Sequence, residues 1–288
     1  MANTKEVLIT ADSTCDLPEY LINQNHIRII PLSILLGDGE YRDGVDIKPQ
    51  DIYEFADKYG ELPKTAAVAP TTYYEIFASA VNKGMQVVHI GLSSGVSSSF
   101  NNARMVAADF DGDVFCVDSK SLCAAMGLLV LKACDFREKG WDAKKIADKV
   151  SKLVPKLSTT FVLNSLEYLH KGGRCSGVAR FGANVLGIKP SIAVDNATGT
   201  MDVAKKYRGK MDVVYQQYVN DCLSDLGKID TSRIIIANSG QIEPKSLAFA
   251  KGLIEGKNKF DEIIEAQAGC TISSHCGPKT LAIFYIRK

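Results

Sequence analysis

The sequence predicts an α/β protein of two domains, the first a largely parallel sheet with helices on both faces and the second a mixed, partly antiparallel sheet. Two observations carry this prediction. Short apolar runs alternate with helical patterns as far as residue 155, and such alternation is typical of parallel sheets covered by helices on both faces. Beyond that point, a hairpin pattern and several separate strands indicate more antiparallel pairing. We therefore expect domains at residues 1–155 and 156–288.

The first domain contains short apolar runs typical of strands, with helical patterns between them. The apolar runs cover residues 7–10, 27–36, 87–90 and 114–117. Apolar side chains at a spacing of three and four predict the helices. The predicted helices cover residues 49–59, 70–81, 100–110, 121–136 and 142–154. Pro155 would end the last of them and close the domain.

The second domain begins with polar and glycine-rich segments and continues with strands. Within residues 166–174 a short helix is predicted to end at the double glycine Gly172-Gly173, as helices often do. Residues 191–204 predict a hairpin whose turn is Asn196–Gly199. A helix is expected between the first two of the later strands, and Ser273–Pro278 reads as a loop. The later strands cover residues 234–237, 263–266 and 281–286.

Composition excludes several classes of protein. The chain has 34 basic and 33 acidic residues, so nothing indicates a nucleic-acid groove. No apolar run approaches the roughly 18 residues of a membrane helix, and the N-terminus lacks a signal-peptide core. The eight cysteines include no C-x-x-C pair, and we expect reduced, mostly buried thiols. These features predict a cytoplasmic protein.

The segment Gly91–Gly95 spells G-x-S-x-G and raises two alternatives. It matches the nucleophile elbow of serine esterases, with Ser93 as the nucleophile. It also opens residues 93–99, called the serine loop below, which hold five serines and would suit a helix N-terminus that binds an anion. The esterase alternative needs an acid and a histidine in chain order. His275 is available, but nothing marks the candidate acid Asp195, so binding is favoured.

Other catalytic and cofactor motifs are missing from the sequence. Neither the P-loop pattern nor G-x-G-x-x-G occurs, so nucleotide binding by these routes is not expected. His275 and Cys276 are adjacent and have no carboxylate cluster beside them, so we expect no metal site. Arg174 follows the Gly172-Gly173 break. It is either a solvated side chain after a helix end or an anion clamp, which suits the planar fork of arginine.

Polar clusters follow several predicted strands, and the carboxyl ends of parallel strands gather ligands at one rim. Their combination resembles the DegV family over essentially the whole chain. The motifs are Asp12-Ser13-Thr14 with Asp16-Leu17-Pro18, Lys64-Thr65, Ser93–Ser97, Leu166–Arg174 and His275-x-Gly277-Pro278. The resemblance implies a bacterial fatty-acid-binding protein without a catalytic group or cofactor of its own. It also implies that such a protein carries the lipid for a separate ATP-binding fatty acid kinase subunit, which phosphorylates the bound carboxylate.

The resemblance also implies where the ligand is held. The acyl chain is expected between the two domains, with its carboxylate near Thr65, the late His275 and one or more loop serines. The family pattern does not decide among Ser93, Ser94 and Ser97. Arg174 is expected near the head group or on the surface that faces the kinase. A bound carboxylate close to His275 should raise the pKa of that histidine.

The chain departs from the family pattern at three places. Residues 66–68 lack the usual hydroxyl after Thr65, the serine loop continues Ser98-Ser99-Phe100, and Lys279 stands where a glycine is common. Acyl chain length and unsaturation are not encoded in any of these motifs.

Overall fold

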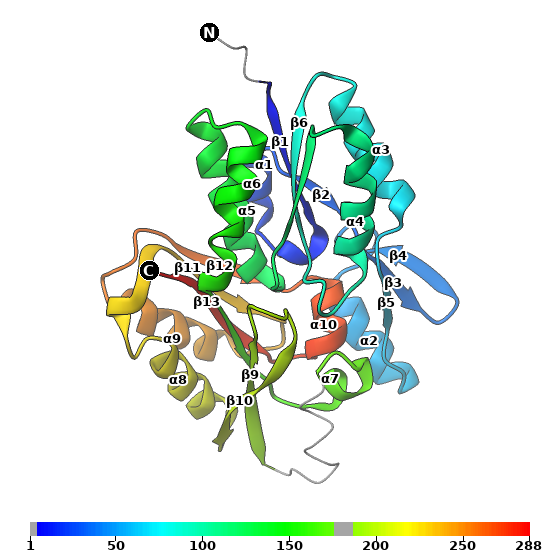
Figure 1. The fold of residues 1–288 in the computed structure, drawn as a ribbon. Coiled ribbons are helices and arrows are strands. Elements are labelled where there is room, and N and C mark those ends of the chain that lie inside the picture. The colour runs from blue at the N-terminus through cyan, green and yellow to red at the C-terminus, as the bar shows by residue number, and fades with distance from the viewer. Residues whose placement is uncertain (1–4, 176–186) are drawn as a thin grey trace.

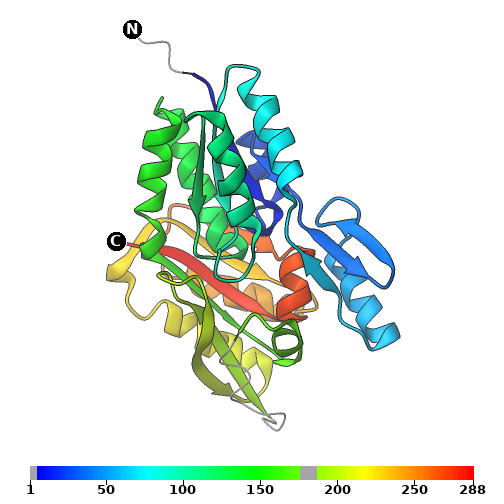
Figure 2. The ribbon, with the colours of Figure 1, turned by 45° about the vertical axis from the view of Figure 1, so that its right-hand side comes forward.

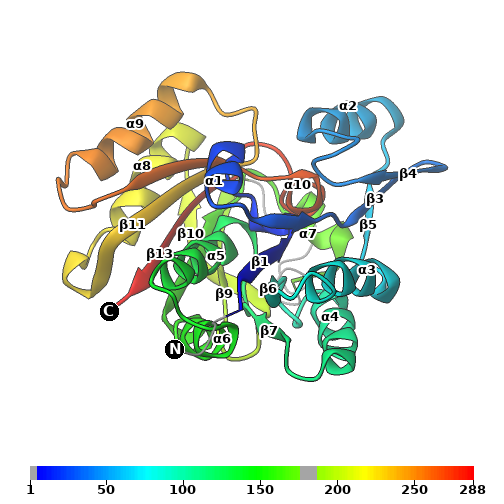
Figure 3. The same cartoon turned by 90° about the horizontal axis from the view of Figure 1, so that it is seen from above.

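The computed structural model describes residues 5–175 and 187–288 and confirms an α/β fold with a wholly parallel first sheet (Figure 1). Across this sheet the strands are β2 (Arg28–Ile30), β1 (Val7–Asp12), β6 (Gln86–Gly91) and β7 (Val114–Asp118). Helices α3 (Pro70–Val81) and α4 (Ser99–Ala107) cover one face. Helices α5 (Cys123–Glu138) and α6 (Ala143–Ser151) cover the other, as Figure 3 shows from above. The prediction of helices on both faces is confirmed.

The second sheet is mixed, as predicted, and has six strands. Every neighbouring pair is antiparallel except the last, which is parallel. Helices α8 (Met211–Cys222) and α9 (Pro244–Glu255) pack on its outer face. The predicted hairpin is confirmed, because Val194 pairs with Met201 across its turn. In spatial order the strands are β10 (Met201–Arg208), β9 (Ile188–Val194), β8 (Leu157–Val162), β13 (Leu281–Arg287), β11 (Ile229–Asn238) and β12 (Ile263–Gln267).

Helix α5 lies between the two sheets and joins their cores. Twelve of its 16 residues are buried, because one side packs on β1 and β6 and the other on β8, β11 and β13. A helix that is apolar all round is typical of such a fully enclosed position. One hydrophobic cluster therefore runs from the first sheet through α5 to the inner face of the second.

A third, three-stranded sheet was not predicted. It projects beside the first sheet and carries α2 (Pro49–Tyr59) (Figure 2). The apolar run at 27–36 is split between sheets, because Pro31 lacks a backbone N–H and follows the end of β2. Helix α1 (Glu19–Gln24) was not predicted either. The strands of the small sheet are β4 (Gly39–Arg42), β3 (Ser33–Leu36) and β5 (Lys64–Ala66).

Two boundaries differ from the sequence prediction. Helix α6 ends at Ser151, and Pro155 lies in a separate 3-10 turn at Val154–Lys156 rather than at the helix end. The prediction of a loop at Ser273–Pro278 was wrong over most of its length, because α10 (Cys270–Cys276) covers that segment. The domain boundary near residue 155 stays a prediction. In residues 5–175 and 187–288, no helix combines the length and apolar character needed to cross a bilayer.

Candidate functional site

A cavity of about 240 Å³ lies between the two main sheets. A single water needs roughly 10–15 Å³ on this measure, so the cavity has room for a much larger molecule. Its walls come from both predicted domains: β5, the serine loop and the start of α5 on one side, and α10 and the second sheet on the other. Most lining side chains are apolar. The apolar ones include Leu32, Leu92, Val96, Leu122, Phe161, Leu169, Met201, Ile272 and Phe284.

One end of the cavity is polar, and Thr65 and His275 meet there. Thr65 lies on β5 and His275 on α10, and Thr65 Oγ1 is 2.9 Å from His275 Nε2. Burial, together with the nearby positive charge of Arg174, lowers the pKa of His275 to about 4. The imidazole is therefore neutral near pH 7.

The tautomer of His275 follows from its other nitrogen. Nδ1 is buried and has no hydrogen-bond partner within the described residues. An orphaned N–H is rarer in protein interiors than an under-used acceptor, so Nε2 carries the proton and donates to Thr65 Oγ1. The hydroxyl proton of Thr65 is then free to donate to a ligand oxygen. His275 thus orients Thr65 as a donor toward the cavity.

The double glycine of α7 (Glu167–Gly172) shapes the same end. A Cβ on Gly172 would collide with Nδ1 of His275, so the close packing of α7 on α10 requires a glycine there. Gly173 ends the helix in the left-handed conformation, at φ +66°. Arg174 follows, donates from Nη1 to the carbonyl oxygen of Gly172 at 2.6 Å, and lines the cavity. Among the described lining residues it is the one permanently charged side chain.

The second half of the serine loop also faces this end. Ser97 and Ser98 line the cavity directly before α4 begins at Ser99. The loop is tied to the Thr65 segment, because the backbone N–H of Val68 donates to Ser99 Oγ at 3.3 Å. The free N–H groups and partial positive charge of a helix N-terminus therefore point toward the same region as Ser97.

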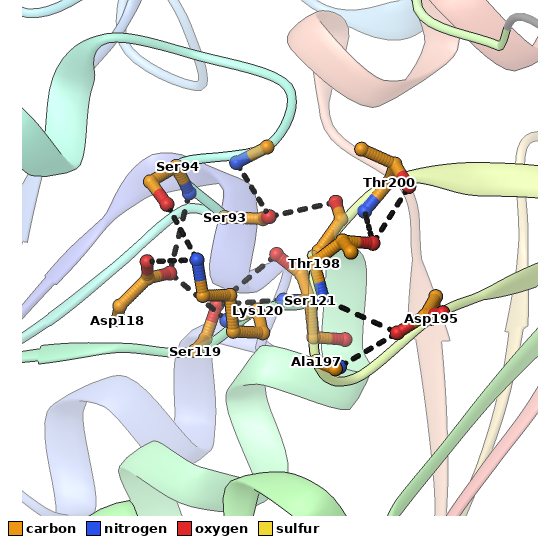
Figure 4. Close-up of polar contacts among 12 residues, drawn as sticks. Ser93, Ser94, Asp118, Ser119, Lys120, Ser121, Asp195, Ala197, Thr198 and Thr200 are labelled. Carbon is orange, nitrogen blue, oxygen red and sulfur yellow. Dashed lines mark hydrogen bonds and ion pairs between the residues drawn. The ribbon is translucent and has the colours of Figure 1, made fainter.

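The first half of the serine loop lies outside the cavity wall. Ser93 is fully buried, and its hydroxyl donates to the carbonyl oxygen of Gly199 at the hairpin turn (2.8 Å; Figure 4). Ser94 Oγ accepts from Lys120 Nζ at 2.8 Å. Gly199 has φ +74°, and a Cβ there would collide with Ser93 Oγ. These two serines join the loop to its neighbours, and Ser97 is the predicted serine that reaches the cavity.

Two buried carboxylates hold the start of α10. The N–H of Gly269 donates to Asp16 Oδ1 at 3.0 Å, and the N–H of Cys270 donates to Asp43 Oδ1 at 2.8 Å. Ser13 Oγ donates to the second oxygen of Asp43 at 2.8 Å. Burial, with Asp43 close by, raises the pKa of Asp16 to about 7. This arrangement, called the α10 clamp below, sets the helix that carries His275.

Sequence reasoning missed the floor of the cavity, which the second sheet supplies. These residues read as ordinary strand and strand-end positions, so no local signal distinguishes them. Asp12, part of the predicted polar rim, serves the site indirectly: its buried carboxylate accepts from the N–H of Leu92 at 2.8 Å, at the entrance to the serine loop. Within the described residues, no group of three or more His, Cys, Asp or Glu side chains is arranged around a metal position. The floor residues are Ala237, Asn238, Ser239, Thr280, Ala282 and Phe284.

Comparison with known proteins identifies the family of this chain. The family model described as "Uncharacterised protein, DegV family" matches residues 6–288. The chain belongs to the DegV family. A DegV domain-containing protein of Clostridium acetobutylicum is 33% identical over 288 residues and matches along 99% of both chains.

Solved structures agree on the DegV fold. A fatty-acid-binding DegV family protein from Thermus thermophilus superposes with a TM-score of 0.89 at 23% identity, covering 98% of this chain and all of that one. A stearic-acid-binding protein from Eubacterium ventriosum superposes with a TM-score of 0.83 at 26% identity, covering 97% and 98% of the two chains. The two-domain α/β architecture is thus shared along the full length.

Proposed function

We propose that this DegV family protein binds one long-chain fatty acid in the cavity, between the predicted domains 1–155 and 156–288. The observation that carries the proposal is a mostly apolar cavity with a polar end at which Thr65, Ser97 and His275 lie. The carboxylate lies at that end and the acyl chain runs along the second sheet. Fatty acid binding by the relatives from Thermus thermophilus and Eubacterium ventriosum supports this assignment.

The polar end suits a carboxylate because it offers hydrogen-bond donors, and none of the described residues that line it is an acid. Thr65 donates its hydroxyl proton to the carboxylate, and Ser97 adds a second hydroxyl. Hydrogen bonds to an ionised acceptor are stronger than neutral ones. Burial of the tail contributes roughly 25 cal/mol per Å² of apolar area, which favours long chains over short ones.

We further propose that the protein presents the carboxylate to a separate ATP-binding kinase in the cytoplasm. A carboxylate oxygen would attack the γ-phosphorus of ATP, the bond to the bridging oxygen would break, and acyl phosphate and ADP would result. Arg174 is exposed and lies in the wall beside His275, so it is accessible from outside and from the cavity. On this proposal the chain supplies no catalytic group, cofactor or metal of its own.

A serine esterase is the weaker alternative. Ser93 is fully buried and donates its proton to the carbonyl oxygen of Gly199, whereas a serine nucleophile donates to an adjacent general base, most often a histidine. His275 is bonded to Thr65 instead. A binding protein for another anionic small molecule fits the polar end but leaves the apolar walls unexplained.

Saturable uptake of stearate or oleate by delipidated protein tests the proposal, measured by displacement of a fluorescent fatty acid. Thr65→Val keeps the shape of the side chain and removes its hydroxyl, so affinity should fall several-fold. Glu243→Gln, on the outer side of the second sheet, is the control and should bind as wild type. Absence of saturable uptake would overturn the proposal. Labelling of Ser93 by a fluorophosphonate, with ester turnover, would support the esterase instead.

The kinase step needs its own measurement. Arg174→Ala should leave fatty acid affinity nearly unchanged and slow acyl phosphate formation by a cognate kinase. Equal loss of binding and phosphorylation would assign Arg174 to the head-group site alone. Unchanged phosphorylation would remove Arg174 from the kinase contact.

A further inference from the structure

The floor of the cavity changes character along β13 and β11. Alternate residues of a strand face the same side, and the lining residues of β13 and the turn before it are Thr280, Ala282 and Phe284. Ala282 pairs with Ala237 of β11, and Phe284 pairs with Ile235. The floor therefore has three successive rows along β13. The polar row lies at Thr280, the alanine row consists of Ala282 and Ala237, and the bulky row consists of Phe284 and Ile235.

The polar row is the one next to the head-group end. Thr280 Oγ1 donates to the carbonyl oxygen of Cys276 at 3.0 Å, directly after His275 on α10. The N–H of Thr280 donates to Ser239 Oγ at 3.0 Å, so both hydroxyls are engaged in the fold. A strand rises about 3.4 Å per residue, which puts Phe284 roughly 14 Å further along the floor than Thr280.

The alanine row forms a depression between larger neighbours. Ala282 lies between Phe161 of β8 and Ala237 of β11, and Ala237 in turn pairs with Ala266 of β12. On the far side, Phe284 and Ile235 are 1% and 0% exposed and close the depression with bulky side chains. Thr271 of α10 also lines the cavity, and its buried hydroxyl has no partner among the described residues.

We propose that Ala282 and Phe284 set the length of the acyl chain that the cavity accepts. The alanine row admits the distal part of the tail, and the ring of Phe284 is the stop against which the terminal methyl group packs. This inference rests on the proposed fatty acid binding and names the residues that select among fatty acids.

Removing the stop should lengthen the preferred chain, and filling the depression should shorten it. Each buried methylene contributes about 0.8 kcal/mol, which is roughly fourfold in affinity. Phe284→Ala should therefore improve the affinity for arachidate relative to palmitate by about tenfold over wild type. Ala282→Leu should change the same ratio by about tenfold in the opposite direction.

The experiment is competition of laurate, myristate, palmitate, stearate and arachidate for each delipidated variant, read by native mass spectrometry. Ile283→Ala is the matched control, because Ile283 lies between the two test positions but faces α8 and α9. Its chain-length preference should equal that of wild type. Phe284→Leu and Ala282→Val make smaller volume changes, and they carry the test if the first pair fails to fold.

The outcomes separate the two proposals. Wild-type protein that takes up no fatty acid would overturn the proposed function. Uptake with a chain-length preference that neither Ala282 nor Phe284 variants alter would overturn this inference and leave fatty acid binding intact. A shift of equal size in Ile283→Ala would also overturn it, because the effect would then follow from loosened packing of the sheet.

Discussion

Among the polar contacts that join the two halves of the chain, two near the cavity differ in kind. The α10 clamp uses two buried carboxylates, Asp16 and Asp43, to hold backbone N–H groups. The contact between the serine loop and the hairpin turn uses a neutral hydroxyl and close glycine packing, with Ser93 against Gly199. The first contact depends on charge and proton occupancy. The second depends on shape, so the two should respond to different perturbations.

Breaking the charged contact should have the largest effect on stability. Asp43→Ala leaves the N–H of Cys270 and the hydroxyl of Ser13 without their acceptor. Each unsatisfied buried donor costs about 1–3 kcal/mol, so we expect a loss of about 3 kcal/mol in the free energy of unfolding. Urea unfolding followed by circular dichroism measures it. Asp46→Ala, an exposed carboxylate nearby in sequence, is the control, and equal losses would contradict the role of the clamp.

Breaking the steric contact should cost somewhat less. Gly199→Ala adds a Cβ that collides with Ser93 Oγ and places alanine at φ +74°. Overpacking and left-handed backbone together should cost about 2 kcal/mol. Gly112 has φ +84°, and a Cβ there would meet no atom within 4 Å, so Gly112→Ala isolates the backbone cost. If both variants lose the same stability, the collision with Ser93 carries no energy.

The proton on Asp16 should make the charged contact depend on pH. The pKa of Asp16 is raised to about 7, whereas an unfolded aspartate releases its proton near pH 4. The folded state thus binds more protons between these values, and this residue makes stability fall as pH rises from about 4 to about 7. Asp16→Asn should flatten that slope in urea unfolding series. Asp46→Asn should not, because the pKa of Asp46 lies at about 2.

Ser97 and Ser93 of the serine loop allow a further comparison, between a contact with the ligand and a contact within the fold. Ser97→Ala removes a hydroxyl from the cavity wall and should weaken fatty acid binding by about 1 kcal/mol. Ser93→Ala removes the bond to Gly199 and should lower stability while leaving affinity near wild type. Fluorescent displacement and thermal unfolding measure the two quantities on both variants. The reverse pattern would assign the head group to Ser93.

The smallest effect concerns the pH dependence of binding. A carboxylate bound near His275 raises its pKa from about 4 in the free protein. Affinity should then fall as pH rises from about 4 to the bound-state pKa and stay level above it. The pH window therefore begins well below neutrality, unlike that of an exposed histidine. His275→Gln should remove this contribution, while the titration of the fatty acid itself is common to both proteins. Identical pH profiles would remove His275 from the head-group site.

Local signals predicted those parts of the fold that depend on neighbouring residues. Helices α2 and α3 begin at Pro49 and Pro70 and end where the apolar spacing ends, so the sequence predicted both to the residue. Helix α10 could not be predicted in this way. The acceptors for its first N–H groups are Asp16 and Asp43, which lie 253 and 227 positions away from their partners. No local capping pattern marks its start.

The sequence by itself determined the alternation of strands and helices and the hydroxyl-rich serine loop, and its resemblance to the DegV family implied that Thr65 and His275 lie near one head group. Tertiary structure decided which hydroxyls face the cavity. Ser93 turns toward Gly199, 106 positions away, whereas Ser97 turns inward. The tertiary structure also decided that alternate residues of β13 and β11 form the cavity floor. Both outcomes depend on strand register and on contacts between distant segments, and periodicity along a chain records which residues are apolar but not which surface they meet.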